Sequence, residues 1–324
     1  MGDGQFSVTF RGVRGSIPTP ASPKQIEKKL RESLCLATAE DVVDSTSIDR
    51  FIEGLPLHLK GCLGGNSACL EMNVDGQLLI FDMGTGCVEL GRELMGGDFS
   101  KGQGVASIFI THTHMDHIMG LPMFGPVYIP GNKLTFHAPI PNLRQRLIRR
   151  QHSDFFPIQF EELPALISFV DLTESSVYEL GNVKIRWLEN DHPGRSFSYR
   201  VEYGGKAAVL STDAEYKSLA PETLDPVLEF FDGADILVFD AQYGFTESVR
   251  MKRDWGHSSS FVGVDMALDA EVKKLALFHH EPNFDDFQLS DNLNQAKSYL
   301  QKLDPDSELE VFLAQEGTTI RLGN

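Results

Sequence analysis

The stretch Ser107 to Leu121, SIFITHTHMDHIMGL, places three histidines and one aspartate close together, directly after an apolar run. Ser107 to Ile110 combines β-branched and aromatic residues, which predicts a short buried strand. The polar cluster follows the end of this strand and comprises His112, His114, Asp116 and His117. Each of these side chains would need its own hydrogen-bond partner in an ordinary core. A divalent transition-metal ion satisfies them together, so the cluster predicts a metal site.

The spacing within the cluster predicts two metal ions. His112 and His114 alternate, so at the end of an extended strand both rings project to one side and can share one ion. Asp116 and His117 lie beyond the strand and can turn towards a second ion about 3.5 to 4 Å away, the usual separation in two-metal hydrolytic sites. Such a pair can hold a bridging hydroxide and polarise the bond that the hydroxide attacks. The protein then needs no serine or cysteine nucleophile.

The pattern His-x-His-x-Asp-His after an apolar strand resembles the metallo-β-lactamase superfamily. Further segments extend the resemblance along nearly the whole chain: RGSIP at 14–18, GGNS at 64–67, STD at 211–213, WGHS at 255–258 and LFHHEP at 277–282. They look most like little-characterised bacterial members of the tRNase Z-like and phosphodiesterase branch. The resemblance implies an α/β fold, a four-layer αββα sandwich of two similar halves, in a single domain over residues 1–324.

Residues 21–59 separate two segments that follow each other closely in such relatives, so we interpret them as a helical insertion near the N-terminus. Pro23 to Ala37 carries leucines and charges at helical spacing, and Ser45 to Ile52 predicts a second short helix. A surface elaboration or a homodimer contact is one interpretation of the insertion, and a lid over the site is the other.

The resemblance implies a complete set of metal ligands. These are His112, His114 and His192 for one ion, Asp116, His117 and His279 for the other, and Asp213 as a carboxylate shared by both. We prefer His279 to its neighbour His280 because His279 comes first after the strand predicted at Leu275 to Phe278. Nitrogen and carboxylate ligands without cysteine favour two Zn²⁺ ions, with Mn²⁺ or Fe as the alternatives.

The resemblance also assigns supporting and catalytic roles. Asp82, at the end of an apolar run, matches an acid that braces the histidine loop. His257 matches an extra histidine that helps to protonate the departing oxygen, and Asp240 is a candidate carboxylate partner that keeps His257 charged. We therefore expect His257, Asp240 and the ligand Asp116 to be the catalytic residues. The alternatives are an ordinary turn aspartate at position 82 and a helix-entry histidine at position 257.

The charge of the chain limits its partners. With 46 acidic and 29 basic side chains, the net charge of −17 repels polyanions, so neither long nucleic acid nor an anionic membrane is expected as a partner. A small anionic substrate remains compatible, because two metal ions would outweigh the local field. No apolar stretch approaches the roughly 18 residues of a membrane span. The cysteines, Cys35, Cys62, Cys69 and Cys87, form no CxxC pair, which indicates reduced thiols and a cytoplasmic protein.

Pro141 to Gln151 is predicted to be a helix, and it concentrates positive charge in an otherwise acidic chain. Its basic residues are Arg144, Arg146, Arg149 and Arg150. They are interpreted either as a solvated face with salt bridges or as a patch that steers anions towards a nearby pocket.

Apolar periodicity predicts the remaining elements. The expected strands are Phe6 to Arg11, Val183 to Asn190, Ser196 to Tyr203, Lys206 to Leu210, Asp235 to Phe239, Lys274 to Phe278 and Glu308 to Leu313. Helices are expected at Ser260 to Asp269 and Asp291 to Gln301. His137 and His152 have no ligand-type neighbours and are interpreted as structural or surface histidines.

The combined pattern predicts a metal-dependent hydrolase that cleaves a phosphodiester in a small molecule, such as a cyclic nucleotide or cyclic phosphate. One alternative is a hydrolase of carboxylic esters, thioesters or lactones on the same site. A second is an RNA-processing nuclease, which the net charge and the lack of a recognisable Gly/Pro-rich arm oppose. A third is a non-catalytic metal-binding regulatory protein, which the complete ligand set opposes. Asp213 stands where true β-lactamases place a cysteine.

Overall fold

The computed structural model describes residues 5–173, 176–218, 220–244 and 254–323. The first half of the chain builds most of one sheet, whose strand order is β14-β1-β2-β3-β4-β5-β6. Its strands are β1 (Phe6–Gly12), β2 (Cys69–Val74), β3 (Gln77–Phe81), β4 (Val105–Phe109), β5 (Lys133–Ala138), β6 (Leu166–Asp171) and β14 (Thr319–Arg321). Antiparallel pairs join β14, β1, β2 and β3, and parallel pairs join β3 to β6.

The second half builds a similar sheet with the order β13-β12-β11-β10-β9-β8-β7. Its strands are β7 (Val177–Leu180), β8 (Val183–Asn190), β9 (Ser196–Tyr203), β10 (Lys206–Ser211), β11 (Ile236–Asp240), β12 (Lys274–Phe278) and β13 (Glu310–Leu313). Here β7 to β10 are antiparallel, and β10 to β13 are parallel. Because loops at the carboxyl ends of parallel strands gather at one edge of a sheet, each half brings its polar strand-end residues together.

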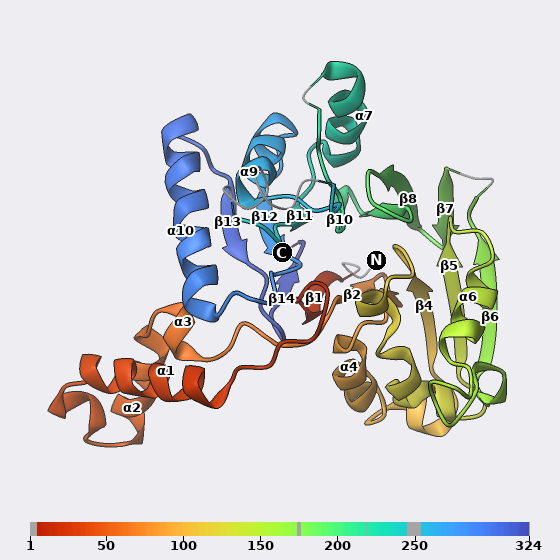
Figure 1. Cartoon of the computed structure of the whole chain (residues 1–324), viewed down its shortest axis with the longest axis horizontal. Helices are drawn as coiled ribbons and strands as arrows, with labels where there is room; N and C mark the ends of the chain where they lie inside the picture. The colour runs from red at the N-terminus through yellow and green to blue at the C-terminus, as the bar shows by residue number, and fades with distance from the viewer. Residues whose placement is uncertain (1–4, 174–175, 219, 245–253, 324) are drawn as a thin grey trace.

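The two sheets pack face to face through a shared apolar core. Phe81 and Phe109 of the first sheet contact Tyr199 of the second, with ring centroids 5.5 and 5.6 Å apart. The outer layers are α4 (Gly86–Leu94) and α6 (Leu143–Arg150) on the first sheet, and α7 (Pro221–Phe231), α9 (Ser260–Asp269) and α10 (Asp286–Leu303) on the second (Figure 1). The expected αββα sandwich is therefore confirmed. Among the described residues no helix is both long and apolar enough to cross a membrane.

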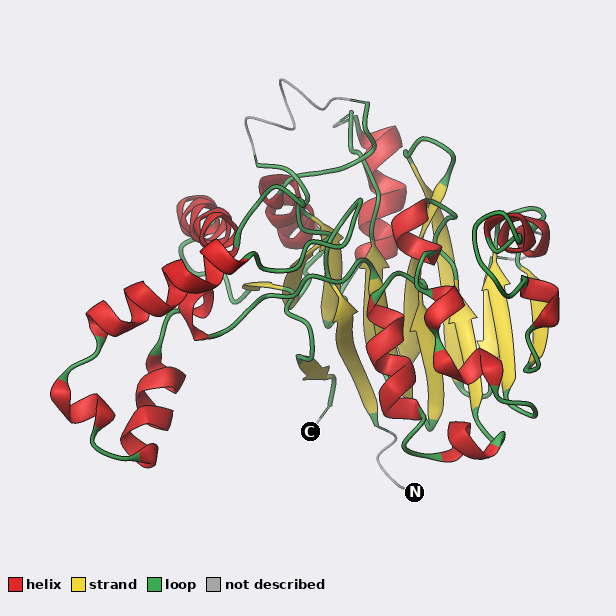
Figure 2. Cartoon of the chain, turned by 60° about the horizontal axis from the view of Figure 1, so that its bottom comes forward, coloured by secondary structure: helices red, strands yellow, loops and turns green. Residues whose placement is uncertain are grey.

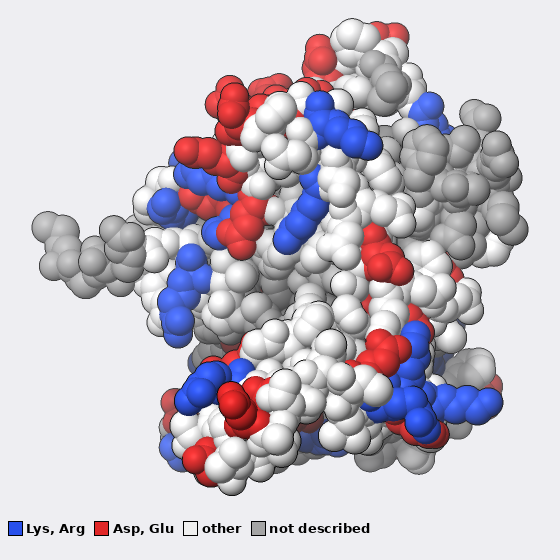
Figure 3. Space-filling view, turned by 90° about the vertical axis from the view of Figure 1, so that its left-hand side faces the viewer, with Lys and Arg blue, Asp and Glu red and all other residues white. Residues whose placement is uncertain are grey.

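The helices predicted between residues 21 and 59 form an arm that projects from the sandwich (Figure 2). The arm contains α1 (Pro23–Leu36), a 3-10 turn (Ala39–Val42), α2 (Ser45–Gly54) and α3 (Leu57–Lys60). Its anchor is Lys29, whose ammonium group forms a buried ion pair with Asp286 at the start of α10. Across the face in Figure 3, where α10 and the arm lie, basic and acidic side chains are interspersed. That the arm is an insertion into one domain stays a prediction.

The bounds of four predicted elements, β8, β9, β12 and α9, agree with the structure residue by residue. The predicted last helix begins earlier than expected, at Asp286. Asp285 accepts a hydrogen bond from the Gln288 backbone, and the Gln288 side chain accepts one from the Asp285 backbone. This capping box satisfies two free N–H groups and fixes the start of α10 there. The expected final strand is also followed by one more, β14, which pairs with β1.

His137, in β5, is buried away from the polar edge of the sandwich. Its ring stacks on Phe109 at 4.6 Å between centroids and contacts Tyr178 at 4.8 Å. Neither ring nitrogen has a hydrogen-bond partner among the described residues. Burial therefore lowers the pKa of His137 to about 4. The structural interpretation of this histidine agrees with these contacts.

We expect His137 to make folding less favourable in acid. The unfolded chain binds a proton at His137 near pH 6.5, whereas the folded chain resists it down to about pH 4, so stability is lost as the pH falls between these values. Replacing His137→Phe should remove this loss. The gain in unfolding free energy, relative to wild type, should be about 2 kcal/mol larger at pH 5 than at pH 7.5. Urea unfolding at both pH values measures it.

The control for this experiment is His152→Gln, at an exposed histidine whose ring contacts the Asp154 carboxylate. Its effect on unfolding should differ between the two pH values by no more than about 0.5 kcal/mol. A gain for His137→Phe that is the same at pH 5 and pH 7.5 would show that His137 is protonated in the folded state.

Candidate metal centre

The ligand-type residues predicted from the sequence meet between the two sheets, at the carboxyl ends of their strands. The first sheet contributes the loop after β4 and the short helix α5 (Met115–Ile118), and the second contributes the ends of β8, β10 and β12. The structure brings together His112, His114, Asp116, His117, His192, Asp213 and His279. Their assignment as metal ligands remains a prediction.

Asp213 lies at the centre of this cluster, with one oxygen facing each group of histidines. Its Oδ1 atom is 3.1 Å from Nε2 of His117 and 3.2 Å from Nε2 of His279. Its Oδ2 atom is 3.6 Å from Nε2 of His112 and 3.7 Å from Nε2 of His192. This is the arrangement expected of a carboxylate shared by two cations.

The first group comprises His112, His114 and His192. Nδ1 of His114 lies 3.0 Å from Nε2 of His192, and the rings of His112 and His114 are perpendicular with centroids 4.5 Å apart. The Nε2 atom of His112 is buried and has no hydrogen-bond partner among the residues that the structure describes. His114 is the exposed member of the group, so the centre is open to solvent at this side chain.

The second group comprises Asp116, His117 and His279. The Nε2 atoms of the two histidines are 3.2 Å apart, and each lies within 3.2 to 3.3 Å of the Oδ2 atom of Asp116. The backbone N–H of Ser16, in the loop after β1, donates to the same oxygen at 2.7 Å. Asp116 is thereby oriented by the chain segment that contains the RGSIP motif.

Fixed acceptors hold the second nitrogen of three of these rings. Nδ1 of His117 donates to Asp82 at 2.8 Å, Nδ1 of His279 to the Gln242 amide oxygen at 3.0 Å, and Nδ1 of His192 to the Gly256 carbonyl at 2.9 Å. In a neutral imidazole the other nitrogen is then an unprotonated acceptor, and here it faces the cluster. Aimed at one another without protons, these nitrogens would repel.

A divalent cation resolves this repulsion. Ligand atoms bound at about 2.0 to 2.1 Å in a tetrahedral site are roughly 3.3 Å apart, close to the separations of 3.0 to 3.3 Å within each group. The partnerless Nε2 of His112 gains an electron-pair acceptor in the same way. The residues present therefore fit two divalent cations, and nitrogen with carboxylate oxygen suits Zn²⁺.

Three residues of the centre have strained backbone conformations. Asp82, Asp213 and His279 each follow the last residues of a strand and have φ values of +62°, +52° and +59°. Such left-handed conformations are uncommon for residues other than glycine and cluster at functional sites. Each turns the chain sharply out of its strand and directs the side chain inward.

Asp82 has the supporting position that the sequence predicts. Its carboxylate accepts the Thr111 backbone N–H at 2.8 Å, the Thr111 hydroxyl at 2.7 Å and the His117 ring N–H at 2.8 Å. It therefore braces both the start of the histidine loop and a predicted ligand. Burial lowers the pKa of His117, but the carboxylates of Asp213, Asp116 and Asp82 outweigh burial and raise it well above its usual value. A cation bound at this ring would therefore displace a proton from it.

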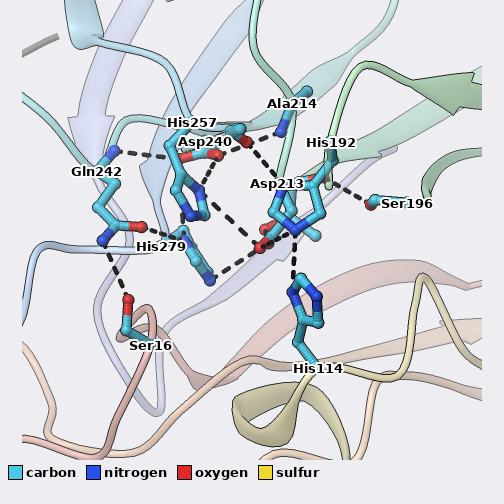
Figure 4. A network of polar contacts seen from close by, with 12 residues as sticks. Ser16, His114, His192, Ser196, Asp213, Ala214, Asp240, Gln242, His257 and His279 are labelled. Carbon is cyan, nitrogen blue, oxygen red and sulfur yellow. Dashed lines mark hydrogen bonds and ion pairs between the residues drawn. The ribbon is translucent and has the colours of Figure 1, made fainter. Parts of the chain in front are cut away.

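His257 and Asp240 form a hydrogen-bonded pair beside the centre (Figure 4). Nδ1 of His257 lies 2.8 Å from Oδ2 of Asp240, at the end of β11. The His257 ring stacks on His279 at 5.0 Å and contacts His192 at 5.3 Å, so it touches a member of each group. Burial lowers the pKa of His257, but the Asp240 carboxylate outweighs this effect and raises it to about 9.

The structure separates the two candidates at positions 279 and 280. His279 faces the cluster, whereas the Nε2 atom of His280 donates to the Ala314 carbonyl at 2.8 Å, away from it. The preference for His279 agrees with this orientation.

Sequence reasoning missed Gln242, which connects three parts of the centre. Its amide oxygen accepts from His279, and its amide nitrogen donates to Ser16 Oγ and to Glu281 at 3.2 Å each (Figure 4). A signal was present, because Gln242 follows the strand-end residue Asp240 by two positions. The Gly256 carbonyl could not have been found, since a backbone acceptor has no sequence signature.

The chain is similar to known proteins in both sequence and fold. Residues 82–280 match the β-lactamase superfamily domain. Ribonuclease Z of Picrophilus torridus is 22% identical over 346 residues, covering 90% of this chain and 91% of that protein. The metallo-β-lactamase fold protein YhfI from Bacillus subtilis superposes with a TM-score of 0.66 at 15% identity, over 98% of this chain and 100% of that one. A diphosphatase from the PhnP family gives a TM-score of 0.57 at 17% identity, over 98% of both chains.

If the cluster holds two cations, the chain should bind about two equivalents of zinc. Removing them with a chelator should lower the melting temperature, because ions that bind only the folded state stabilise it by mass action. Elemental analysis after zinc loading and desalting, together with calorimetric melting before and after chelation, tests both statements. Less than about half an equivalent, with an unchanged melting temperature, would contradict the ligand assignment.

Replacing Asp82→Asn should weaken zinc binding by about 10- to 100-fold without removing a ligand. An asparagine keeps the shape and the left-handed backbone, but it has one acceptor oxygen instead of two. Either the Thr111 backbone N–H or the His117 ring N–H then faces an NH₂ group and loses its acceptor. Competition with a chromophoric chelator measures the affinity. The matched control is Asp75→Asn, another strand-end aspartate with positive φ, which should bind zinc like the wild type. Equal affinity of the two variants would exclude the bracing role.

Proposed function

Because the chain belongs to the β-lactamase superfamily of metal-dependent hydrolases, as its sequence pattern predicts, we propose that it hydrolyses a phosphodiester in a small anionic molecule. Two cations would be held by His112, His114 and His192, by Asp116, His117 and His279, and by the shared Asp213. When bound, such cations polarise the phosphoryl group and activate water. Zn²⁺ is the proposed metal, with Mn²⁺ or Fe as alternatives.

The pair formed by His257 and Asp240 is the observation that carries the proposal. Departure of an alkoxide from a phosphodiester needs a proton, and a cationic imidazole at the edge of the centre can supply it. Asp240 orients the His257 ring through Nδ1 and stabilises its charge, and Asp240 is itself held by the backbone N–H groups of Ala214 and Gln242. We assign proton donation to His257 and positioning to Asp240.

Asp116 is predicted both as a metal ligand and as a catalytic residue. Its Oδ2 atom contacts both His117 and His279, which favours the ligand role. The bond from the Ser16 N–H leaves this carboxylate little freedom to rotate, so we do not assign it a proton transfer.

RNA processing is the second candidate, because the relatives matched in sequence include proteins named ribonuclease Z. Long-range repulsion by a net charge of −17 opposes a polyanionic substrate. Hydrolysis of a carboxylic ester, thioester or lactone is a further candidate, and it would depend less on proton donation by His257.

The cytoplasm is the proposed location, supported by cysteines that are all free.

A panel of phosphodiesters with metal-loaded protein tests the proposal. A 4-nitrophenyl diester and a cyclic nucleotide should both be hydrolysed. His257→Ala should lower kcat for the cyclic nucleotide by about 10²- to 10⁴-fold. The loss should be much smaller for the 4-nitrophenyl diester, because nitrophenolate leaves without a proton. Initial rates at saturating substrate measure both effects.

Two controls accompany this experiment. His152→Ala, at an exposed histidine far in sequence from the centre, should leave both rates unchanged, and His114→Ala should abolish both. Failure to hydrolyse any diester would exclude the proposed function. Equal losses with both substrates in His257→Ala would exclude proton donation by this residue.

A further inference from the structure

A cleft of about 640 Å³ lies next to the candidate metal centre, between α5 and α6. Its volume is that of a site for a small molecule. Arg146, Arg149 and Arg150 of α6 line it, together with Met115, Ile118 and Phe155. The cleft thus combines cationic and apolar side chains in a protein with a large negative net charge.

The three arginines of the cleft have no carboxylate partner in the described part of the chain, unlike the fourth arginine of the helix. Arg144 pairs with Glu161 at 3.5 Å on the exposed side of α6. Arg149 is exposed, and the buried Nε–H group of Arg150 has no acceptor within the described ranges. Among the described residues, the salt-bridged interpretation therefore applies to Arg144 but not to the three arginines of the cleft. Guanidinium groups that line one cleft without forming ion pairs make a site for an anion.

A hydrogen bond connects this cleft to the metal centre. Arg146 donates to the Thr113 hydroxyl at 3.0 Å, and Thr113 lies between the predicted ligands His112 and His114. His114 is the exposed member of its group, and both of its neighbours in sequence, Thr113 and Met115, line the cleft. The cleft therefore borders the centre on its exposed side, along residues 113–115.

The apolar residues of the cleft suit the organic part of such a molecule. Phe155 and Met115 are 69% and 52% exposed, which leaves an aromatic ring and a thioether available to contact a planar base or another apolar group. The arginines and this apolar surface line the same cleft, so one ligand of nucleotide size can contact both.

We propose that the arginine cleft binds a second phosphate group of the substrate. The inference rests on the proposed phosphodiesterase function and narrows it to phosphodiesters of nucleotide size that also carry a phosphomonoester. A phosphomonoester has a charge of about −1.5 to −2 at pH 7 and three acceptor oxygens. That charge balances several guanidinium groups, which a single carboxylate does not.

Calorimetric titration of the metal-loaded protein tests the subsite without turnover. Adenosine 3′,5′-bisphosphate and adenosine 5′-monophosphate contain no diester, and they differ only in the second phosphate. The bisphosphate should bind at least about tenfold more tightly, in line with charge-assisted hydrogen bonds. Arg149→Gln and Arg150→Gln should each remove most of this preference. Arg149 is exposed, so its variant tests the site even if the Arg150 variant folds poorly.

The matched control is Arg144→Gln, which removes a positive charge from the same helix outside the arginine cleft. It should keep the full preference. Equal binding of the two nucleotides by the wild type, or a preference that survives in both cleft variants, would overturn the proposal. Tighter binding of a transfer RNA transcript than of the bisphosphate, lost in Arg149→Gln, would assign the cleft to RNA instead. If the wild type hydrolyses no diester but still prefers the bisphosphate, the proposed function is refuted and the subsite is not.

Discussion

The buried carboxylate of Asp213 is the constraint on which the rest of the structure depends. An ionised group removed from water costs several kcal/mol unless opposite charges and hydrogen bonds surround it. Here its partners come from both sheets, so the sheets must keep one relative position. Two cross-sheet hydrogen bonds fix that position beside the centre, from Tyr199 Oη to the Ile110 carbonyl at 2.8 Å and from the Phe197 N–H to the Thr111 carbonyl at 3.1 Å.

Much of the fold and of the centre could be predicted from the sequence, because the polar residues directly follow apolar strands. The αββα architecture follows from such strand ends in both halves, as at His112 and Asp213. The helix α4 was missed because its glycines indicate a turn. Gly86 is required there for another reason: a Cβ atom would lie 2.4 Å from the Arg11 carbonyl carbon of β1. Strands β5 to β7 were missed as well, because polar residues interrupt their apolar runs, as Thr135 and His137 do in β5.

The contacts around the predicted ligands could not be predicted in the same way. Gln242, Ser16 and the Gly256 carbonyl come from three separate loops, and only the fold places them against histidines. The position of the arginines of α6 could not be predicted from the sequence either. Their helix was predicted, but whether they faced solvent or the centre depended on the rotation of α6 on its sheet. Packing of Leu143 and Leu147 into the core settles that rotation and turns Arg146 towards Thr113.

The pairing of β14 with β1 has a consequence for how the chain folds during synthesis. Thr9 and Thr319 share a hydrogen bond across 310 positions, so β1 stays an open sheet edge until the ribosome has released nearly the whole chain. Open edges invite pairing with other chains, and contacts between distant segments form slowly. His112, His114 and His117 emerge long before His279. The nascent chain therefore carries an unpaired strand edge for most of its translation, and the first sheet is completed only when β14 reaches β1.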